Sequence, residues 1–443
     1  MREEKIDGVY YRLDKDNLTA EVIEQRTGID NDYRGDIIIR ETVVSNEVSY
    51  LVTSIGEQAF SCCKSLKSIS IPRSVTSIGE KAFDGCLSLT TIEVAKDNTV
   101  YDSRENCNAL IHTATNTIIR GCQNTTIPNS VTNIGYRAFY GCESLKSIII
   151  PDSVTSIGEE AFCICKLLKY IIIPDSVTNI GYRAFYGCES LKSIIIPDSV
   201  TSIGEMAFYC CESLKSIIIS DSVTSIGEMA FDRCHSLTTI EVAKRNTMYD
   251  SRENCNALIH TATNTLILGC QNTTIPNSVK SIGDRAFCEC ISLKSIVIPN
   301  SVTSIGKDAF GCCFSLKSIN IPDSVTSIGD SAFKDCESLK YITIPDSVTT
   351  IAWGTFDHCK SLKAIAIPES VRCIGDYAFK DCESLKYIVI PVSVISIGYA
   401  FSGCESLYTI CYDGTKEQWK KITLDKVGGS WLHVECYDGN MKI

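Results

Sequence analysis

The sequence predicts a solenoid, a stack of short and similar coils, and two observations lead to this prediction. The dipeptide Ile-Gly recurs every 23 residues, as at Gly135, Gly158, Gly181 and Gly204, apart from two steps of 56 residues and one slot filled by Ala352. Thirteen of the 14 phenylalanines lie four positions after this glycine, or three in the last repeat, and only Phe314 is out of register. A repeat of this length cannot bury its own apolar face, whereas stacked repeats form a continuous core.

Each coil is expected to contain two strands. In "SLKSIII", residues 213–219, the side chains of Leu214, Ile217 and Ile219 are expected to point inward, as in a strand with one buried face. The proline that usually follows closes the strand, because proline has no N–H for a sheet ladder, and Asp-Ser favours a turn. "VTSIG" then predicts a short second strand, its glycine permits a tight turn, and Ala-Phe and Cys pack back into the core.

The two long steps share an insert. Residues 90–131 recur at 238–279 with four substitutions. The offset between the two copies equals one long step between glycines plus four steps of the usual length. This offset indicates that a whole block, from Gly79 to Gly227, was copied. Within the insert, "NALIHTATNTIIRGC" predicts two short strands around a polar turn, as a hairpin or an extra coil on the solenoid edge.

The two ends of the chain depart from the repeat, as solenoid ends must if they are to cover exposed apolar faces. We expect a β-rich N-terminal cap over residues 1–49 with a turn at Asp14–Asn17, and a C-terminal cap over 412–443. The repeats fill 50–411, with inserts at about 95–127 and 243–275.

A short helix is predicted near the C-terminus. Thr415 followed by Gln418 resembles a capping box, in which each side chain bonds to the other residue's backbone N–H. Trp419 and Ile422 are expected to seal the last coil.

Cysteine occurs 25 times, an odd number, so the thiols cannot all pair within the chain. Thirteen recur with the core, where cysteine acts as a small hydrophobic residue and a weak donor to backbone carbonyls. These ladder cysteines are Cys63, Cys86, Cys142, Cys165, Cys188, Cys211, Cys234, Cys290, Cys313, Cys336, Cys359, Cys382 and Cys404. Others, such as Cys210, are interpreted as partly exposed and without chemistry, in preference to a disulfide or redox role.

The pattern L-x-x-I-x-I with a cysteine at fixed offset resembles leucine-rich repeats, and "IPDSVTSIGEMAFYCCESLKSI" resembles the BspA-type class of bacterial surface proteins. The resemblance covers residues 50–411. It implies a leucine-rich repeat solenoid: a right-handed, β-rich, α/β horseshoe-like superhelix with one long parallel sheet.

Charge and hydropathy exclude several classes of function. The net charge of −11 disfavours nucleic acid as a partner unless a basic stripe offsets it, and no such stripe is evident. The longest apolar runs are much shorter than the roughly 20 residues of a membrane-spanning helix. The N-terminal "MREEKIDGVYY" shows no export signal.

No catalytic or cofactor motif is evident, so we predict no enzyme activity and no cofactor. Cys107, His112 and Cys122, repeated as Cys255, His260 and Cys270, lack a fourth ligand and do not match common zinc spacings. We therefore predict no metal site and favour duplicated structural thiols.

Two faces are candidates for ligand binding. The first is the solvent side of the sheet, because four consecutive repeats place isoleucine at one outward slot and tyrosines appear at another. Its residues are Ile149, Tyr170, Ile172, Ile195, Ile218, Tyr341 and Tyr387. The alternative interpretation is that stacked isoleucines only stabilise the sheet.

The second candidate face gathers tyrosines beside the Ala-Phe core, and these could hold a glycan or a protein. They are Tyr136, Tyr140, Tyr182, Tyr186 and Tyr209. Repetition alone is the alternative, because the segment 134–159, which contains the first two tyrosines, recurs word for word at 180–205. A row of lysines, partly matched by glutamates three positions earlier, is interpreted as a solvated face that keeps the stack soluble.

These patterns indicate a non-enzymatic binding protein that presents a rigid face to a protein or glycan, and we expect a monomer. The family resemblance implies a bacterial cell-surface or secreted protein with an adhesin-like role. The alternative is an intracellular structural or scaffold protein, since many unpaired cysteines fit a reducing compartment.

Overall fold

The computed structural model describes residues 1–25, 33–424 and 433–442. The chain divides into two compact units. The first unit contains Met1–Leu214 and Ser222–Cys234, and the second contains Lys215–Asp221 and His235–Ile443. The proposed end caps include 26–32, 425–432 and 443, which lie outside the described residues.

The first unit begins with a mostly antiparallel sheet in the order β1-β2-β3-β6-β5. Its strands are β1 (Arg2–Ile6), β2 (Val9–Asp14), β3 (Thr19–Val22), β6 (Val48–Ile55) and β5 (Thr42–Ser45). The Asp14 carboxylate accepts hydrogen bonds from the backbone N–H of Asp16 (2.9 Å) and from Nδ2 of Asn17 (2.8 Å). The predicted turn at this position is therefore confirmed. Strand β6 also pairs in parallel with β8 (Ser77–Ile78), which leads into the coils.

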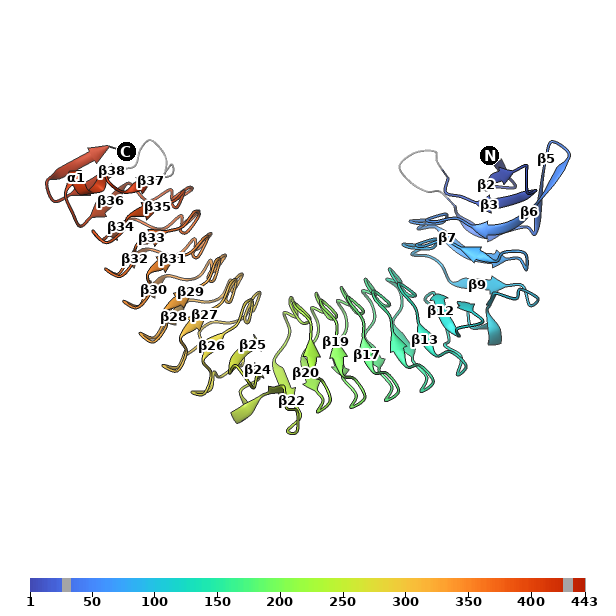
Figure 1. Cartoon of the computed structure of the whole chain (residues 1–443), viewed down its shortest axis with the longest axis horizontal. Helices are drawn as coiled ribbons and strands as arrows, with labels where there is room; N and C mark the ends of the chain where they lie inside the picture. The colour runs from blue at the N-terminus through green and yellow to red at the C-terminus, as the bar shows by residue number, and fades with distance from the viewer. Residues whose placement is uncertain (26–32, 425–432, 443) are drawn as a thin grey trace. The chain divides into compact units, whose positions relative to one another are not determined.

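The coils of the first unit carry two rows of parallel strands, seen in Figure 1. We call them the long-strand row and the short-strand row. The long-strand row contains β4 (Gly35–Ile38), β7 (Leu66–Ile71), β9 (Thr91–Val94), β14 (Ser147–Ile149), β16 (Tyr170–Ile172) and β18 (Ser193–Ile195). The short-strand row contains β13 (Asn133–Ile134), β15 (Ser156–Ile157), β17 (Asn179–Ile180), β19 (Ser202–Ile203) and β21 (Ser225–Ile226).

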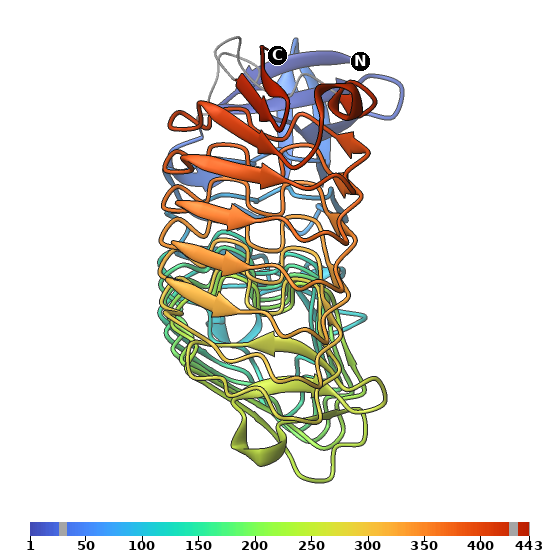
Figure 2. The same cartoon turned by 90° about the vertical axis from the view of Figure 1, so that its left-hand side faces the viewer.

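The second unit repeats this arrangement, and Figure 2 shows its long strands lying one above another. The long-strand row contains the pair β20 (Ser216–Ile219) and β22 (Thr239–Val242), then β28 (Ser318–Asn320), β30 (Tyr341–Thr343), β32 (Ala364–Ala366), β34 (Tyr387–Ile390), β36 (Thr409–Tyr412) and β38 (His433–Cys436). A last strand, β39 (Gly439–Lys442), pairs antiparallel with β38. The short-strand row contains β26 (Ser281–Ile282), β27 (Ser304–Ile305), β29 (Ser327–Ile328), β31 (Thr350–Ile351), β33 (Cys373–Ile374), β35 (Ser396–Ile397) and β37 (Thr423–Leu424).

Stacked phenylalanines run through the core of each unit. Rings of neighbouring coils, from Phe139 to Phe231 in the first unit, lie 5.0–5.3 Å apart between centroids and are nearly parallel. In the second unit, from Phe287 to Phe401, the separations are 5.1–5.7 Å. Phe314 lies outside the stack and is 41% exposed. The core register predicted from the repeat is confirmed.

The ladder cysteines link one coil to the coil before it. The thiol of Cys211 donates to the carbonyl oxygen of Phe185 (3.4 Å), and that of Cys336 donates to Phe310 (3.2 Å). Burial raises the pKa of both thiols well above the ordinary value. The predicted structural role of these cysteines is confirmed, although Cys290 is only half-buried.

The structure corrects the expected α/β architecture. Among the described residues, α1 (Lys416–Trp419) is the sole α-helix, with two 3₁₀ turns, η1 (Arg104–Asn106) and η2 (Arg252–Asn254). The Ala-Phe-x-x-Cys segments form no helix. Alternate N–H groups bond to the next coil, as Phe162 N does to Ala184 O (2.7 Å), and those between them close turns within the segment, as Cys165 N does to Phe162 O (3.2 Å). The expected single long sheet is likewise replaced by two rows, because the Ser-Ile segments also pair from coil to coil.

A tight turn starts at the repeated glycine, as predicted, since Ala207 N donates to Gly204 O (3.2 Å), but this turn does not depend on a backbone conformation special to glycine. Gly204 has no positive φ; instead, a Cβ atom there would lie 2.6 Å from the carbonyl carbon of Gly181 in the preceding coil. Other residues of the coil adopt the left-handed backbone conformation with positive φ, such as Met206 (φ 53°) and Cys210 (φ 58°). The glycine is therefore required by the close approach of two backbones.

Each insert forms the predicted hairpin. In the first unit, β10 (Tyr101–Asp102), β11 (Leu110–His112) and β12 (Thr117–Arg120) are antiparallel, and β12 then pairs in parallel with β13. In the second unit, β23 (Tyr249–Asp250), β24 (Ala257–His260) and β25 (Thr265–Gly269) lead in the same way to β26. The last strand of each insert thus continues the short-strand row.

The predicted capping box opens α1. Gln418 N donates to Oγ1 of Thr415 (3.3 Å), and Thr415 N donates to Oε1 of Gln418 (2.9 Å). Trp419 is buried, and its ring lies 5.1 Å from that of Tyr412 between centroids. No helix within the described ranges has the length and apolarity needed to cross a membrane.

Candidate binding faces

Three isoleucines form an exposed stripe on the first unit. Ile149, Ile172 and Ile195 are 84%, 80% and 70% exposed, and we call them the isoleucine stripe. Ile149 and Ile172 are direct partners in the parallel pair β14–β16, so their side chains lie one strand apart. The intervening residues of the same strands, such as Ile148 and Ile171, point into the core. The alternation predicted for these strands therefore exposes a continuous apolar surface.

Charged residues border the stripe on both sides. Lys146, Lys169 and Lys192 are exposed where the strands begin, and Asp152, Asp175 and Asp198 are exposed just beyond their ends. Tyr170 is 55% exposed next to the stripe, with Nζ of Lys192 lying 5.9 Å from its ring centroid. An apolar strip with a charged rim is typical of a protein-binding surface.

An open groove lies at the insert end of the stripe. It is lined by Thr125, Thr126, Ile127 and Asn129 on one side and by residues 147–153, including Ile149, on the other. Strand β14 pairs only with β16 among the described strands, so its other edge faces this groove. The insert therefore leaves the first long strand after it without a neighbour on one side.

The other predicted residues of this face belong to the second unit. Ile218 belongs to β20 in the second unit, is 42% exposed and pairs with Glu241. Tyr341 and Tyr387 are 58% and 53% exposed, also in the second unit, where Asn320, Thr343 and Ala366 fill the isoleucine slot of β28, β30 and β32. These predicted residues therefore belong with the second unit.

The tyrosines of the second candidate face are held by arginines. The guanidinium of Arg137 lies 3.9 Å from the ring centroid of Tyr140 and 5.6 Å from that of Tyr136. Arg183 contacts Tyr182 and Tyr186 in the same way, at 4.8 and 5.3 Å. Tyr209 stacks on Tyr186 at 5.1 Å and contacts Arg233. These rings already have cationic or aromatic partners, and all but Tyr136 are half-buried.

The thiols of the insert bond to the backbone. Sγ of Cys107 donates to Ala109 O (3.7 Å) and Sγ of Cys122 to Asn108 O (3.3 Å), while Nδ1 of His112 lies 3.0 Å from Oγ1 of Thr115. Burial raises the pKa of Cys107 to about 11, which disfavours the thiolate that a metal ligand requires.

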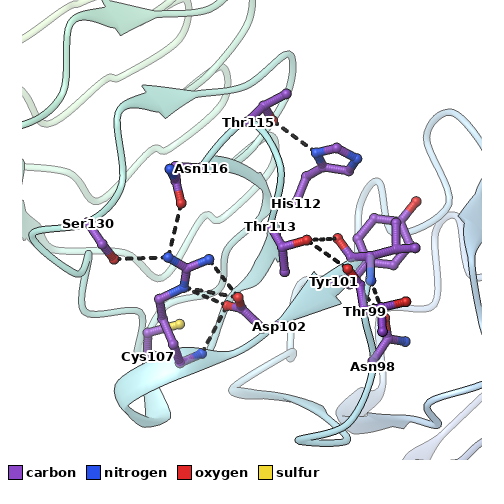
Figure 3. Close-up of polar contacts among 12 residues, drawn as sticks. Asn98, Thr99, Tyr101, Asp102, Cys107, His112, Thr113, Thr115, Asn116 and Ser130 are labelled. Carbon is purple, nitrogen blue, oxygen red and sulfur yellow. Dashed lines mark hydrogen bonds and ion pairs between the residues drawn. The ribbon is translucent and has the colours of Figure 1, made fainter.

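A second feature of the insert is the ion pair between Arg104 and Asp102. The guanidinium also donates to Asn116 Oδ1 (3.0 Å), so these polar groups satisfy one another (Figure 3). The same ion pair recurs in the second insert as Arg252 and Asp250. The insert is therefore interpreted as a structural element.

A cluster that was not recognised in the sequence lies in the second unit. Asp357, His358 and Asp381 bring three potential metal-ligand atoms within 4.8 Å of one another. Lys334 and Lys380 occupy the same cluster, since their Nζ atoms lie 3.4 and 3.2 Å from the two carboxylates. We interpret it as a salt-bridge network. The only signal for it was that His358 and Asp381 are one repeat apart and so fill the same slot in successive coils.

The lysine row of the second unit is continuous. We define it as Lys294, Lys317, Lys340, Lys363 and Lys386, all of them exposed. The backbone N–H of each of the last four donates to the carbonyl of the preceding lysine at 3.1–3.3 Å. The glutamates expected to match such lysines bond elsewhere: Glu143 pairs with Lys166 and Glu337 with Lys360.

Comparison with known proteins places these features in a family. The model of the BspA type leucine rich repeat region matches residues 41–119, 116–238, 157–263, 265–372 and 326–424. A leucine rich cell surface protein from Faecalibacterium prausnitzii is 31% identical, with 96% of this chain and 98% of that chain covered and a TM-score of 0.57. A leucine-rich repeat protein from Bacteroides ovatus is 30% identical, with 95% of this chain and 97% of that chain covered and a TM-score of 0.49. No curated protein matches the chain.

Proposed function

Because the chain belongs to the BspA-type leucine-rich repeat family, we propose that it is a non-enzymatic binding protein of the bacterial surface, adhesin-like, which holds a protein partner on the isoleucine stripe. The location is supported by the cell-surface relative from Faecalibacterium prausnitzii. The observation that carries the proposal is the exposure of isoleucine in three successive repeats: Ile149 and Ile172 pair directly on β14 and β16, and Ile195 lies on the following long strand, β18.

The stripe is large enough to contribute substantially to affinity. Burying an exposed isoleucine side chain contributes about 1.5–3 kcal/mol, so covering Ile172 and Ile195, which are 80% and 70% exposed, contributes roughly 3 kcal/mol. The lysine and aspartate rims add electrostatic complementarity, which favours the encounter and fixes the orientation of the partner. The groove beside Ile149 offers room for a side chain of the partner at one end of the stripe.

The test replaces both exposed isoleucines with lysine. The variant Ile172→Lys/Ile195→Lys is expected to fold normally, because both side chains are exposed, and to bind its partner about a hundredfold more weakly. The matched control is Asn320→Lys/Thr343→Lys, which adds the same charge at the same slot of the second unit.

The partner is first captured from extracellular-matrix and bacterial-envelope extracts, identified by mass spectrometry, and its affinity is then measured by calorimetry with both variants. Equal affinity for the wild-type protein and the isoleucine variant would refute the role of the stripe. Unfolding of the isoleucine variant would show that the stripe is covered in the native protein.

A second function is favoured by one observation. Buried ladder thiols such as Cys188, Cys211 and Cys336 are unpaired, which suits a reducing compartment and thus an intracellular scaffold. Fractionation of cells that produce the protein distinguishes the two: recovery from the envelope or medium supports the surface protein, and recovery from the cytoplasm supports the scaffold.

A further inference from the structure

Among the residues that the structure describes, the lysine row of the second unit has no acidic partner. Within the described residues, no carboxylate lies within 4.0 Å of the Nζ atom of any of its five lysines, although other lysines of the same unit, such as Lys334 and Lys360, are paired. The five are exposed and occupy successive coils. Their backbones are about 4.8 Å apart, so like charges are held close together in a line. This repulsion is relieved when an anion binds along the row.

The row is a line and not a patch. Each coil contributes one lysine at the start of its strand, whereas the acidic residues Asp323, Asp346 and Glu369 are exposed beyond the other end of the strands. Figure 2 shows these long strands of the second unit stacked one above another. A ligand that gains from all five lysines must therefore be extended, carry regularly spaced negative charges, and keep to one edge of the row of strands.

Hydroxyl groups and aromatic rings lie next to the lysines. The residue after each lysine is Ser295, Ser318, Tyr341, Ala364 or Tyr387, and the last four are direct neighbours in the ladder. The two tyrosines are 58% and 53% exposed and lie two strands, or roughly 10 Å, apart. Such rings can stack on the C–H face of a sugar, and the hydroxyls can bond to its oxygen atoms.

We propose that the lysine row of the second unit, with Tyr341 and Tyr387, binds an extended acidic polysaccharide that carries one carboxylate on each sugar. The length of one sugar in such a chain is comparable with the separation of neighbouring strands. A carboxylate therefore meets a lysine at every strand, or at every second strand if alternate sugars face away. This site is separate from the isoleucine stripe, so either proposal can fail without the other.

Nucleic acid fits the row less well. Phosphates of duplex DNA are spaced about 3.4 Å along each strand, closer than the lysines, and proteins that hold single strands stack successive bases on aromatic side chains. Here Ala364 lies between the two tyrosines and leaves every second strand without a ring. The net charge of −11 also opposes a ligand of high charge density more strongly than one with a single charge per sugar.

The test uses polygalacturonate in calcium-free buffer, with its fully methyl-esterified form as the uncharged polymer. We compare the wild-type protein with Lys317→Gln/Lys340→Gln/Lys363→Gln and with the control Lys244→Gln/Lys280→Gln/Lys307→Gln, which removes three exposed lysines of the same unit outside the row. The row variant is expected to bind polygalacturonate about tenfold more weakly or worse, while the control binds nearly as the wild type does.

Two further measurements test the proposal. Raising the salt concentration should weaken the binding of polygalacturonate to the wild-type protein more steeply than its binding to the row variant. Tyr341→Ala/Tyr387→Ala should weaken binding without changing this dependence on salt. Unchanged circular dichroism and denaturation midpoints establish that the variants are folded.

Three results would overturn the proposal. They are equal binding of the charged and esterified polymers, equal losses in the row and control variants, and tighter binding of a DNA duplex or single-stranded oligonucleotide than of polygalacturonate.

Discussion

Replacing one ring of the phenylalanine stack tests the packing that the repeat predicts. Phe208 is fully buried between Phe185 and Phe231, with centroid separations of 5.2 and 5.3 Å. Truncation of a buried phenylalanine to alanine costs about 3–5 kcal/mol. The cost here is expected near the upper end, because two ring contacts, each worth about 0.5–1.5 kcal/mol, are lost together.

The assay must report local stability, because long repeat arrays do not unfold as one cooperative unit. We therefore propose amide hydrogen exchange of the neighbouring coils, where Phe185 N donates to Ala207 O and Phe208 N donates to Ala230 O at 2.8 Å. If these amides exchange through local unfolding, a decrease of about 4 kcal/mol in the free energy of that unfolding accelerates their exchange roughly a thousandfold. The control is Phe314→Ala, expected to change stability by about 0.5 kcal/mol or less, because Phe314 is 41% exposed. Similar effects of the two substitutions would refute the core register.

Two other predictions concern buried polar groups. Arg120 is 3% exposed, and within the described part of the chain its Nε and Nη2 have no hydrogen-bond partner. Its Nη1 lies 3.8 Å from Asp84, a carboxylate with which Arg137 also pairs, and the second insert has Leu268 in the place of Arg120. Arg120→Leu is therefore expected to raise stability by about 2 kcal/mol in urea denaturation, and a lower midpoint would show that the charge is needed. Burial raises the pKa of Cys86 to about 12 from 9.0. The stability that the protonated thiol contributes is therefore complete below about pH 9 and is lost as the pH rises toward about 12. By about pH 10 the free energy of unfolding is expected to fall by about 1.4 kcal/mol. Cys86→Ala should therefore lose less stability than the wild type between pH 8 and 10, and parallel losses would contradict this.

Much of the fold could be predicted because one residue type fills each slot many times. The buried phenylalanines, the ladder cysteines, the insert hairpin and the Thr415 capping box all follow from spacing and side-chain chemistry. The absence of helix in the Ala-Phe-x-x-Cys segments did not follow, because alternate N–H groups of each segment, such as that of Phe162, bond to the next coil. The role of the glycine was missed for the same reason, since its constraint comes from the backbone of the preceding coil.

The candidate sites were only partly predictable. Alternation in the strands gave the exposure of Ile149, Ile172 and Ile195, but not the groove beside them, which depends on how the insert ends. The arginines that occupy the tyrosine cluster stand next to those tyrosines in the sequence, yet their ring contacts depend on side-chain direction. The missing partners of the lysine row could not be recognised, because the glutamate that precedes such a lysine bonds to a different lysine in the following coil.

The bonds between coils also determine how such a gene can change length. Most coils donate and accept through the same atoms, from a cysteine thiol to a phenylalanine carbonyl on one side and from a phenylalanine N–H to an alanine carbonyl on the other. A recombination event that adds or removes whole repeats therefore joins surfaces that already fit. The copied block from Gly79 to Gly227 is an event of this kind. Outward-facing residues can meanwhile diverge freely, so the length of the protein and the chemistry of its surface are inherited independently.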